Sequence, residues 1–94
     1  MEDMIHHVSD TALWIAGFRA QETERKDAAF KDLLAKALAG ERGMKMVAAT
    51  PNMEAMALAI VVRTCAIDSM LEHAISEGVD TIINLGAGLD ARPY

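Results

Sequence analysis

The chain has 94 residues, which allows one small domain, and a domain of this size buries a smaller share of its surface than a large one. Apolar residues make up 52% of the sequence and charged residues 24%, a balance that predicts a folded protein and excludes a disordered one. The net charge is -5 and the basic residues are interspersed with acidic ones, so we expect no general nucleic-acid binding.

Metal sites, disulfides and membrane spans are not expected either. Cys65 is the only cysteine, and it lies in an apolar helical pattern as a small buried side chain would. His6 and His7 are adjacent, so on a helix they point in different directions, and no acidic or cysteine partner stands at ligand spacing. The acidic start lacks the layout of a signal peptide, and the longest apolar run, residues 55–62, is too short to cross a membrane. These features predict a cytoplasmic protein.

The first expected element is a helix over residues 10–24. Ser9 or Asp10 can cap its amino terminus, because both side chains accept hydrogen bonds from helical amides. Gly17 lies inside this helix and weakens it by about 1 kcal/mol relative to alanine. A glycine kept at such a position indicates that another element packs closely against it.

A second helix is expected over residues 27–39. Apolar side chains recur there at spacings of three and four, Asp27 suits the dipole at the amino terminus, and Gly40 can end the helix. The apolar positions are Phe30, Leu33, Leu34, Ala37 and Leu38. Residues 40–50 show no clear period and are interpreted as a linker.

The longest expected helix covers residues 52–77. Thr50 can cap it, Pro51 suits a first-turn position, and Gly78 can end it. Its large apolar side chains cannot all share one narrow stripe, so the helix should have neighbours on more than one side. These side chains are Met56, Ile60, Val61, Ile67, Met70, Leu71 and Ile75.

Residues 80–85 change period and predict a short buried strand, because the segment is rich in β-branched residues and lies between Gly78 and Gly86. A single strand cannot satisfy its own backbone donors and acceptors. A parallel partner would need a long crossover connection, for which no residues follow. We therefore expect the parent fold to be α/β, with its first strand only in this chain.

A glycine loop over residues 86–90 follows the strand. Gly86 and Gly88 lack a Cβ, so the backbone there can turn sharply and lie against a ligand. With Ala91 they also satisfy the spacing of a dinucleotide-binding fingerprint. Asp90 argues mildly against that ligand, because a carboxylate repels a pyrophosphate, whereas the cationic sulfonium of S-adenosylmethionine tolerates it.

The segment from Asn84 to Tyr94, with the sequence NLGAGLDARPY, resembles the first motif of the leucine carboxyl methyltransferase-like family, including its bacterial O-methyltransferases. Shorter stretches upstream are similar to the helical part that precedes this motif in bacterial members. They include residues 11–16, Arg19, Ala20, residues 30–32, residues 38–40, residues 62–64 and Asp68. The resemblance implies a class I methyltransferase, a Rossmann-like doubly wound sheet, with S-adenosyl-L-methionine as cofactor.

The resemblance also implies roles for particular residues. Gly86 would contact the cofactor in a loop shaped by Gly88, and Arg63 would pair with the methionine carboxylate of the cofactor. The full set of expected cofactor-binding residues is Arg19, Arg63, Gly86, Ala87, Gly88 and Asp90. Independently of the family, Arg63 is the only charge between Glu54 and Asp68 in a very apolar helix, so it requires a partner or a route to solvent.

These observations divide the chain into a helical lead-in, residues 1–50, and the start of a cofactor-binding domain, residues 51–94. We expect an O-methyltransferase acting on a carboxylate or hydroxyl of a small molecule, with catalytic and acceptor-binding residues beyond Tyr94. The chain alone should therefore be inactive. Two alternatives stay open: part of a nicotinamide-dependent oxidoreductase, and a non-enzymatic helical module that self-associates through its apolar helix and strand edge.

Overall fold

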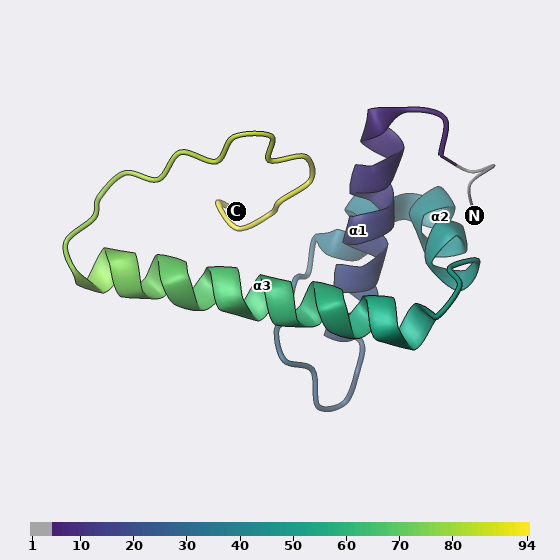
Figure 1. The fold of residues 1–94 in the computed structure, drawn as a ribbon, viewed down its shortest axis with the longest axis horizontal. Helices are drawn as coiled ribbons and strands as arrows, with labels where there is room; N and C mark the ends of the chain where they lie inside the picture. The colour runs from purple at the N-terminus through teal and green to yellow at the C-terminus, as the bar shows by residue number, and fades with distance from the viewer. Residues whose placement is uncertain (1–4) are drawn as a thin grey trace.

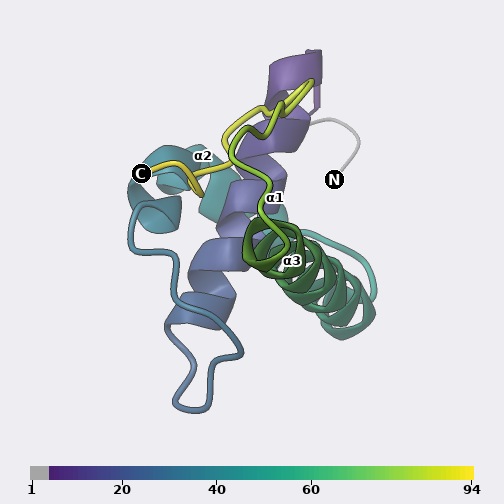
Figure 2. The same cartoon turned by 90° about the vertical axis from the view of Figure 1, so that its left-hand side faces the viewer.

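The computed structural model describes residues 5–94, and within this range it contains three helices and no strand. Helix α1 spans Val8–Thr23, α2 spans Ala35–Ala48 and α3 spans Met53–Ser76. The long helix α3 crosses α1, and the chain after it returns towards α1 as an irregular tail (Figure 1). A view along α3 places α2 and α3 on different sides of α1 (Figure 2).

Helix α1 corresponds to the helix expected over residues 10–24, but its cap differs from the expected one. The N-cap is His7, whose Nδ1 accepts a hydrogen bond from the amide of Ser9 at 3.4 Å. Asp10 stands in the first turn and its carboxylate accepts hydrogen bonds from the amides of His6 and His7 at 2.8 and 3.0 Å. The prediction that Ser9 or Asp10 is the N-cap is therefore wrong, because Asp10 reaches back in a capping box.

The carboxylate of Asp10 is held by groups on both sides. The backbone N–H of His6 lowers the pKa of Asp10, burial opposes this shift, and the guanidinium of Arg42 supports it. Arg42 belongs to α2 and lies 2.9 Å from the Asp10 carboxylate. The cap of α1 therefore also joins this helix to α2.

Helices α1 and α2 approach each other at two glycines. A Cβ added to Gly17 would lie 2.6 Å from Cγ2 of Val47 and 2.9 Å from the carbonyl oxygen of Gly43. Phe18 and Val47 are buried beside this crossing and form the core together with Ile60 of α3. The close packing predicted from Gly17 is confirmed.

The helix expected over residues 27–39 begins only at Ala35. The preceding segment is a loop, because side chains at the end of α1 bind its backbone amides. The Glu22 carboxylate accepts a hydrogen bond from one loop amide at 2.7 Å, and the Thr23 hydroxyl accepts one from the amide of Asp32 at 2.9 Å. Such bonds compete with helix formation, and apolar spacing does not reveal them.

Gly40 interrupts α2 without ending it. Its backbone has φ 64° and ψ -173°, outside the helical region, and helical structure resumes directly after it. The prediction of a linker over residues 40–50 is therefore wrong for most of that range. The resumed helix is short, and it buries Met46 and Val47 one after the other, so the segment shows no clear apolar period.

Helix α3 agrees closely with the helix expected over residues 52–77, but it begins differently. Its N-cap, Asn52, has the left-handed backbone conformation and makes no capping side-chain hydrogen bond. The Thr50 hydroxyl, expected to cap α3, instead accepts a hydrogen bond from the indole N–H of Trp14 at 2.9 Å and donates one to the Met46 carbonyl at 2.8 Å. Thr50 therefore ties the junction of α2 and α3 to α1.

The strand expected over residues 80–85 is absent from the described part of the chain, since no partner strand is there to pair with it. Its side chains are exposed instead, Ile83 at 80% and Leu85 at 87%.

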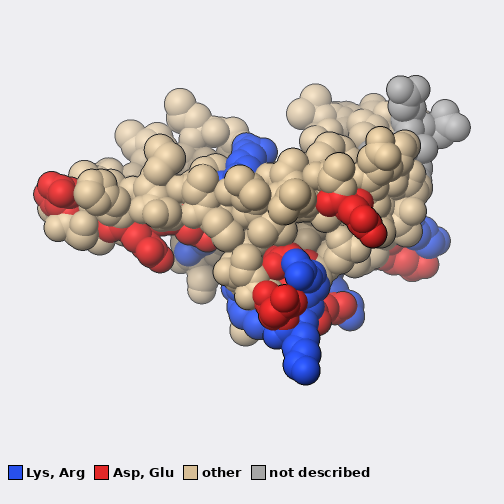
Figure 3. All heavy atoms as spheres, turned by 60° about the horizontal axis from the view of Figure 1, so that its bottom comes forward, with Lys and Arg blue, Asp and Glu red and all other residues tan. Residues whose placement is uncertain are grey.

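Several large side chains of α3 are exposed as well: Leu58, Val62, Met70 and Ile75. Figure 3 shows a band of uncharged residues along α3 between charged groups near its ends. None of the helices within residues 5–94 combines the length and apolar character of a membrane span.

We expect Gly17→Ala to destabilise the fold, although alanine is intrinsically the better helix former by about 1 kcal/mol. The new Cβ would press on the backbone of Gly43, and no change of rotamer relieves a backbone contact. Overpacking of this kind costs about 1–3 kcal/mol. Urea unfolding followed by circular dichroism should show a lower midpoint, whereas the exposed change Lys36→Ala should shift the midpoint little. A higher midpoint for Gly17→Ala would contradict the close crossing.

Candidate functional site

The returning tail forms one side of an open pocket, and α1 and α3 form its other sides. This glycine-loop pocket has a volume of about 720 Å³. The first half of α1 lines one side, and residues 86–89 of the tail line another. Arg19 of α1 and Arg63 of α3 contribute to the same lining. The pocket therefore gathers five of the six residues expected to bind a cofactor, although they come from three separate segments.

The glycine loop itself is shaped by its backbone. Gly86 and Gly88 have φ values of 63° and 56°, in the left-handed region that favours glycine. A Cβ at Gly86 would meet nothing within 4 Å, so glycine is required there for its conformation rather than for lack of space. The amide of Asp90 donates to the carbonyl of Ala87 at 3.1 Å and closes the turn. Gly86 and Gly88 thus leave the backbone bare at two of the four tail positions that line the pocket.

Arg63 is the uncompensated charge of this pocket. Its side chain is exposed, and it makes no hydrogen bond or ion pair with any residue in the range 5–94. It also lines a smaller pocket of about 110 Å³ beside the first, together with Ala87. A guanidinium with free donors can grip a carboxylate through two parallel hydrogen bonds. The pocket therefore offers a cationic site to an anionic group.

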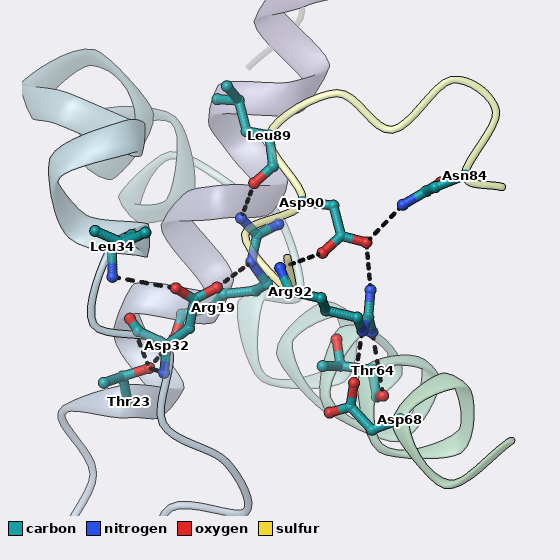
Figure 4. A network of polar contacts seen from close by, with 10 residues as sticks. All are labelled: Arg19, Thr23, Asp32, Leu34, Thr64, Asp68, Asn84, Leu89, Asp90 and Arg92. Carbon is teal, nitrogen blue, oxygen red and sulfur yellow. Dashed lines mark hydrogen bonds and ion pairs between the residues drawn. The ribbon is translucent and has the colours of Figure 1, made fainter. Parts of the chain in front are cut away.

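Arg19 has a different environment, although it lines the same pocket. Its Nε donates to the Asp32 carboxylate at 2.9 Å, and its Nη2 donates to the carbonyl of Leu89. Figure 4 shows the guanidinium between these two partners. The side chain is only 12% exposed. Arg19 therefore joins α1 to the loop before α2 and to the tail, and two of its donors are already engaged.

Asp90, the sixth expected residue, lies outside the lining of the glycine-loop pocket. Its carboxylate accepts hydrogen bonds from the Asn84 side chain at 3.0 Å and from the Arg92 amide at 2.9 Å. Burial raises the pKa of Asp90, but the amide and guanidinium of Arg92 outweigh this effect and hold it below the ordinary value. Asp90 therefore closes the loop as a carboxylate, and it lines the smaller pocket together with Arg63 and Ala87.

Comparison with known proteins gives the family. Residues 12–94 match the family described as leucine carboxyl methyltransferase. The chain belongs to this family. A relative in Streptomyces coelicolor is 42% identical, one in Streptomyces avermitilis 38% and one in Frankia alni 39%. Each of the three is named, by inference, as an S-adenosyl-L-methionine-dependent methyltransferase.

These three alignments cover 89% of the chain but 32% of each relative, so the chain spans about a third of their length. No solved structure matches the chain. The resemblance to the leucine carboxyl methyltransferase family inferred from the motif over residues 84–94 is confirmed. The Rossmann-like sheet of the parent fold stays a prediction.

One residue of this leucine carboxyl methyltransferase-family motif was missed by the sequence analysis. Arg92 links the tail to α3, with its Nε 2.6 Å from the Asp68 carboxylate of that helix. A signal for the pair was available, because Asp68 and the segment that contains Arg92 both belong to the residues that resemble the family. The spacing of 24 residues between them reveals no contact without the fold.

Acid should release the glycine loop of this family member. The lowered pKa of Asp90 means that its stabilising contribution is complete above the ordinary value of 3.8 and is lost as the pH falls through the lower folded value. We expect the side-chain amide resonances of Asn84 to move towards those of a free asparagine in that range.

Asp90→Asn is the matched control for this titration. It should give Asn84 resonances close to the free position already at pH values where the parent chain is fully ordered. Asn84 resonances that stay fixed through the acid range in the parent chain would contradict the role assigned to the Asp90 carboxylate.

Proposed function

We propose that the chain forms the first part of the cofactor site of an S-adenosylmethionine-dependent O-methyltransferase. The observation that carries this proposal is the unpaired guanidinium of Arg63 in the pocket that the glycine loop also lines. S-adenosylmethionine carries a carboxylate at one end and a cationic sulfonium near it, and it contains no phosphate. The relatives named above support the methyl donor, and the family name supports a carboxyl oxygen as acceptor.

Each wall of the pocket then has a separate task. Arg63 holds the methionine carboxylate, while Gly86, Ala87 and Gly88 let the cofactor lie against backbone. Asp90 keeps the loop in shape and adds a negative charge that a sulfonium tolerates. When bound, S-adenosylmethionine would supply an electrophilic methyl group for transfer to an acceptor oxygen of a small molecule.

The nicotinamide alternative is weaker on two grounds. Asp90 places a carboxylate in the turn where a dinucleotide would bring its pyrophosphate, and the three relatives are named for S-adenosylmethionine. A dinucleotide also has no carboxylate to occupy the guanidinium of Arg63, although its phosphates could approach that cation. Titration with NADH separates the two hypotheses directly.

Arg63→Gln should weaken S-adenosylmethionine and leave 5′-methylthioadenosine unaffected. The second compound keeps the adenosine but lacks the amino-acid carboxylate, so it cannot use the guanidinium. We expect an affinity loss of about tenfold or more for the cofactor, equivalent to about 1.4 kcal/mol. Amide chemical shifts of Gly86 and Gly88, followed to millimolar ligand because binding by this chain should be weak, provide the measurement.

The control variant is Lys45→Gln, which removes an exposed cation on α2 away from the pocket and should change neither affinity. Equal weakening of both ligands by Arg63→Gln would contradict the carboxylate contact. Saturable shifts at Gly86 with NADH and none with S-adenosylmethionine would reject the methyl donor.

Self-association is a second proposal, favoured by the exposed apolar side chains of α3 and the tail. Met70 is 70% exposed and Ile83 is 80% exposed, and surfaces of this kind tend to be covered by another apolar surface. Sedimentation equilibrium should then show an average mass that rises with protein concentration, and Met70→Lys should reduce the rise. A monomer mass at every concentration would contradict it.

A further inference from the structure

We propose that Arg92 is a positioning residue that holds the glycine loop opposite Arg63 by fastening the loop to the same helix. The proposal rests on the function proposed above, in which Arg63 and the glycine loop bind one cofactor from two sides. Nothing in the pocket lining joins these two sides directly. Arg92 lies outside that lining, but it lines the neighbouring smaller pocket together with Arg63 and Ala87, and it bridges the two sides there by hydrogen bonds.

On the side of α3, Arg92 binds the turn that carries Arg63. Its Nε donates to the Asp68 carboxylate at 2.6 Å, and its Nη2 donates to the carbonyl of Thr64 at 3.4 Å. Thr64 directly follows Arg63, and Asp68 stands four residues beyond Thr64, about one helical turn away. Arg92 therefore binds the same turn of α3 that positions Arg63.

On the side of the tail, Arg92 closes the loop through Asp90. Its Nη1 and its own amide both donate to the Asp90 carboxylate, and the Asn84 side-chain amide donates to the same group at 3.0 Å. Asn84 precedes Gly86 and Gly88, whereas Arg92 follows them. The two ends of the loop therefore meet at one carboxylate, as Figure 4 shows.

The shape of the guanidinium explains why an arginine stands here. It is a planar fork with several donors, so it can bind two carboxylates and a carbonyl together, whereas a lysine ammonium acts as a compact point charge. The side chains of Arg92 and Asp68 are 30% and 39% exposed, and pairs so accessible to water contribute little to global stability. The contribution of Arg92 is therefore expected in the order of the loop rather than in the stability of the fold.

Hydrogen exchange without any ligand tests this inference. Asp68→Asn changes only α3, yet it should speed exchange of the Asp90 and Arg92 amides by about threefold or more, because the loop opens more often. Core amides of α1 should keep their rates. Lys36→Gln breaks another exposed ion pair, that with Glu24, and should change none of these rates.

Cofactor affinity gives the second readout. Arg92→Gln and Asp68→Asn should each weaken S-adenosylmethionine, and the double variant should be no weaker than Arg92→Gln alone, because both changes break the same link. Arg92→Lys should retain part of the affinity through its charge. A residue with a purely structural role would lower the melting temperature in proportion to these losses, which we do not expect.

Two results would overturn the proposal. One is unchanged exchange at Asp90 and Arg92 in Asp68→Asn, and the other is faster exchange throughout the core, which would make the pair a support of the whole fold. The failure of the proposed function would look different. Loop exchange would then respond to Asp68→Asn as expected, while S-adenosylmethionine produced no saturable shift in the parent chain.

Discussion

The close approach of α1 and α2 at Gly17 and Gly43 is the constraint on which the arrangement depends. Only glycines let the two backbones come so near, and this proximity places Phe18 and Val47 where they can pack with Ile60 of α3. That packing sets the crossing of α1 and α3. Arg19 and Arg63 consequently line one pocket although they stand on different helices. Helix packing, and not the glycine-loop motif alone, therefore determines which residues meet at the site.

The tail is held in a different way from the helices. Its apolar residues Ile83 and Leu85 are exposed, and hydrogen bonds from Arg19 and Arg92 connect it to the helices. The guanidinium of Arg19 holds the carbonyl of Leu89, and Arg92 holds the side chain of Asp68. Burial therefore contributes little to the placement of the glycine loop, and directional hydrogen bonds determine where it lies.

Elements with a long, regular pattern could be predicted from the sequence, and those decided by single contacts could not. The sequence predicts the bounds of α3 closely because the apolar character of this helix continues over many turns. The start of α2 was misplaced because Glu22 and Thr23 bind loop amides, and no periodicity records such bonds. The prediction of a strand over residues 80–85 is wrong for another reason, because a strand forms only beside a second strand that pairs with its backbone. The isolation of Arg63 in an apolar helix can be seen in the sequence, whereas the link between Arg92 and Asp68 can be seen only in the fold.

Trp14 and Tyr94 are two intrinsic fluorophores in different environments, one among the helices and one in the tail. Trp14 is the only tryptophan, its ring meets Phe18 edge-on at a centroid distance of 5.6 Å, and its indole N–H is bound to Thr50. The fluorescence emission of Trp14 therefore reports on the packing of the helices. Tyr94, the only tyrosine, is 93% exposed at the end of the tail. Native fluorescence can consequently follow the docking of the helices and the motion of the tail as separate events, without an added dye.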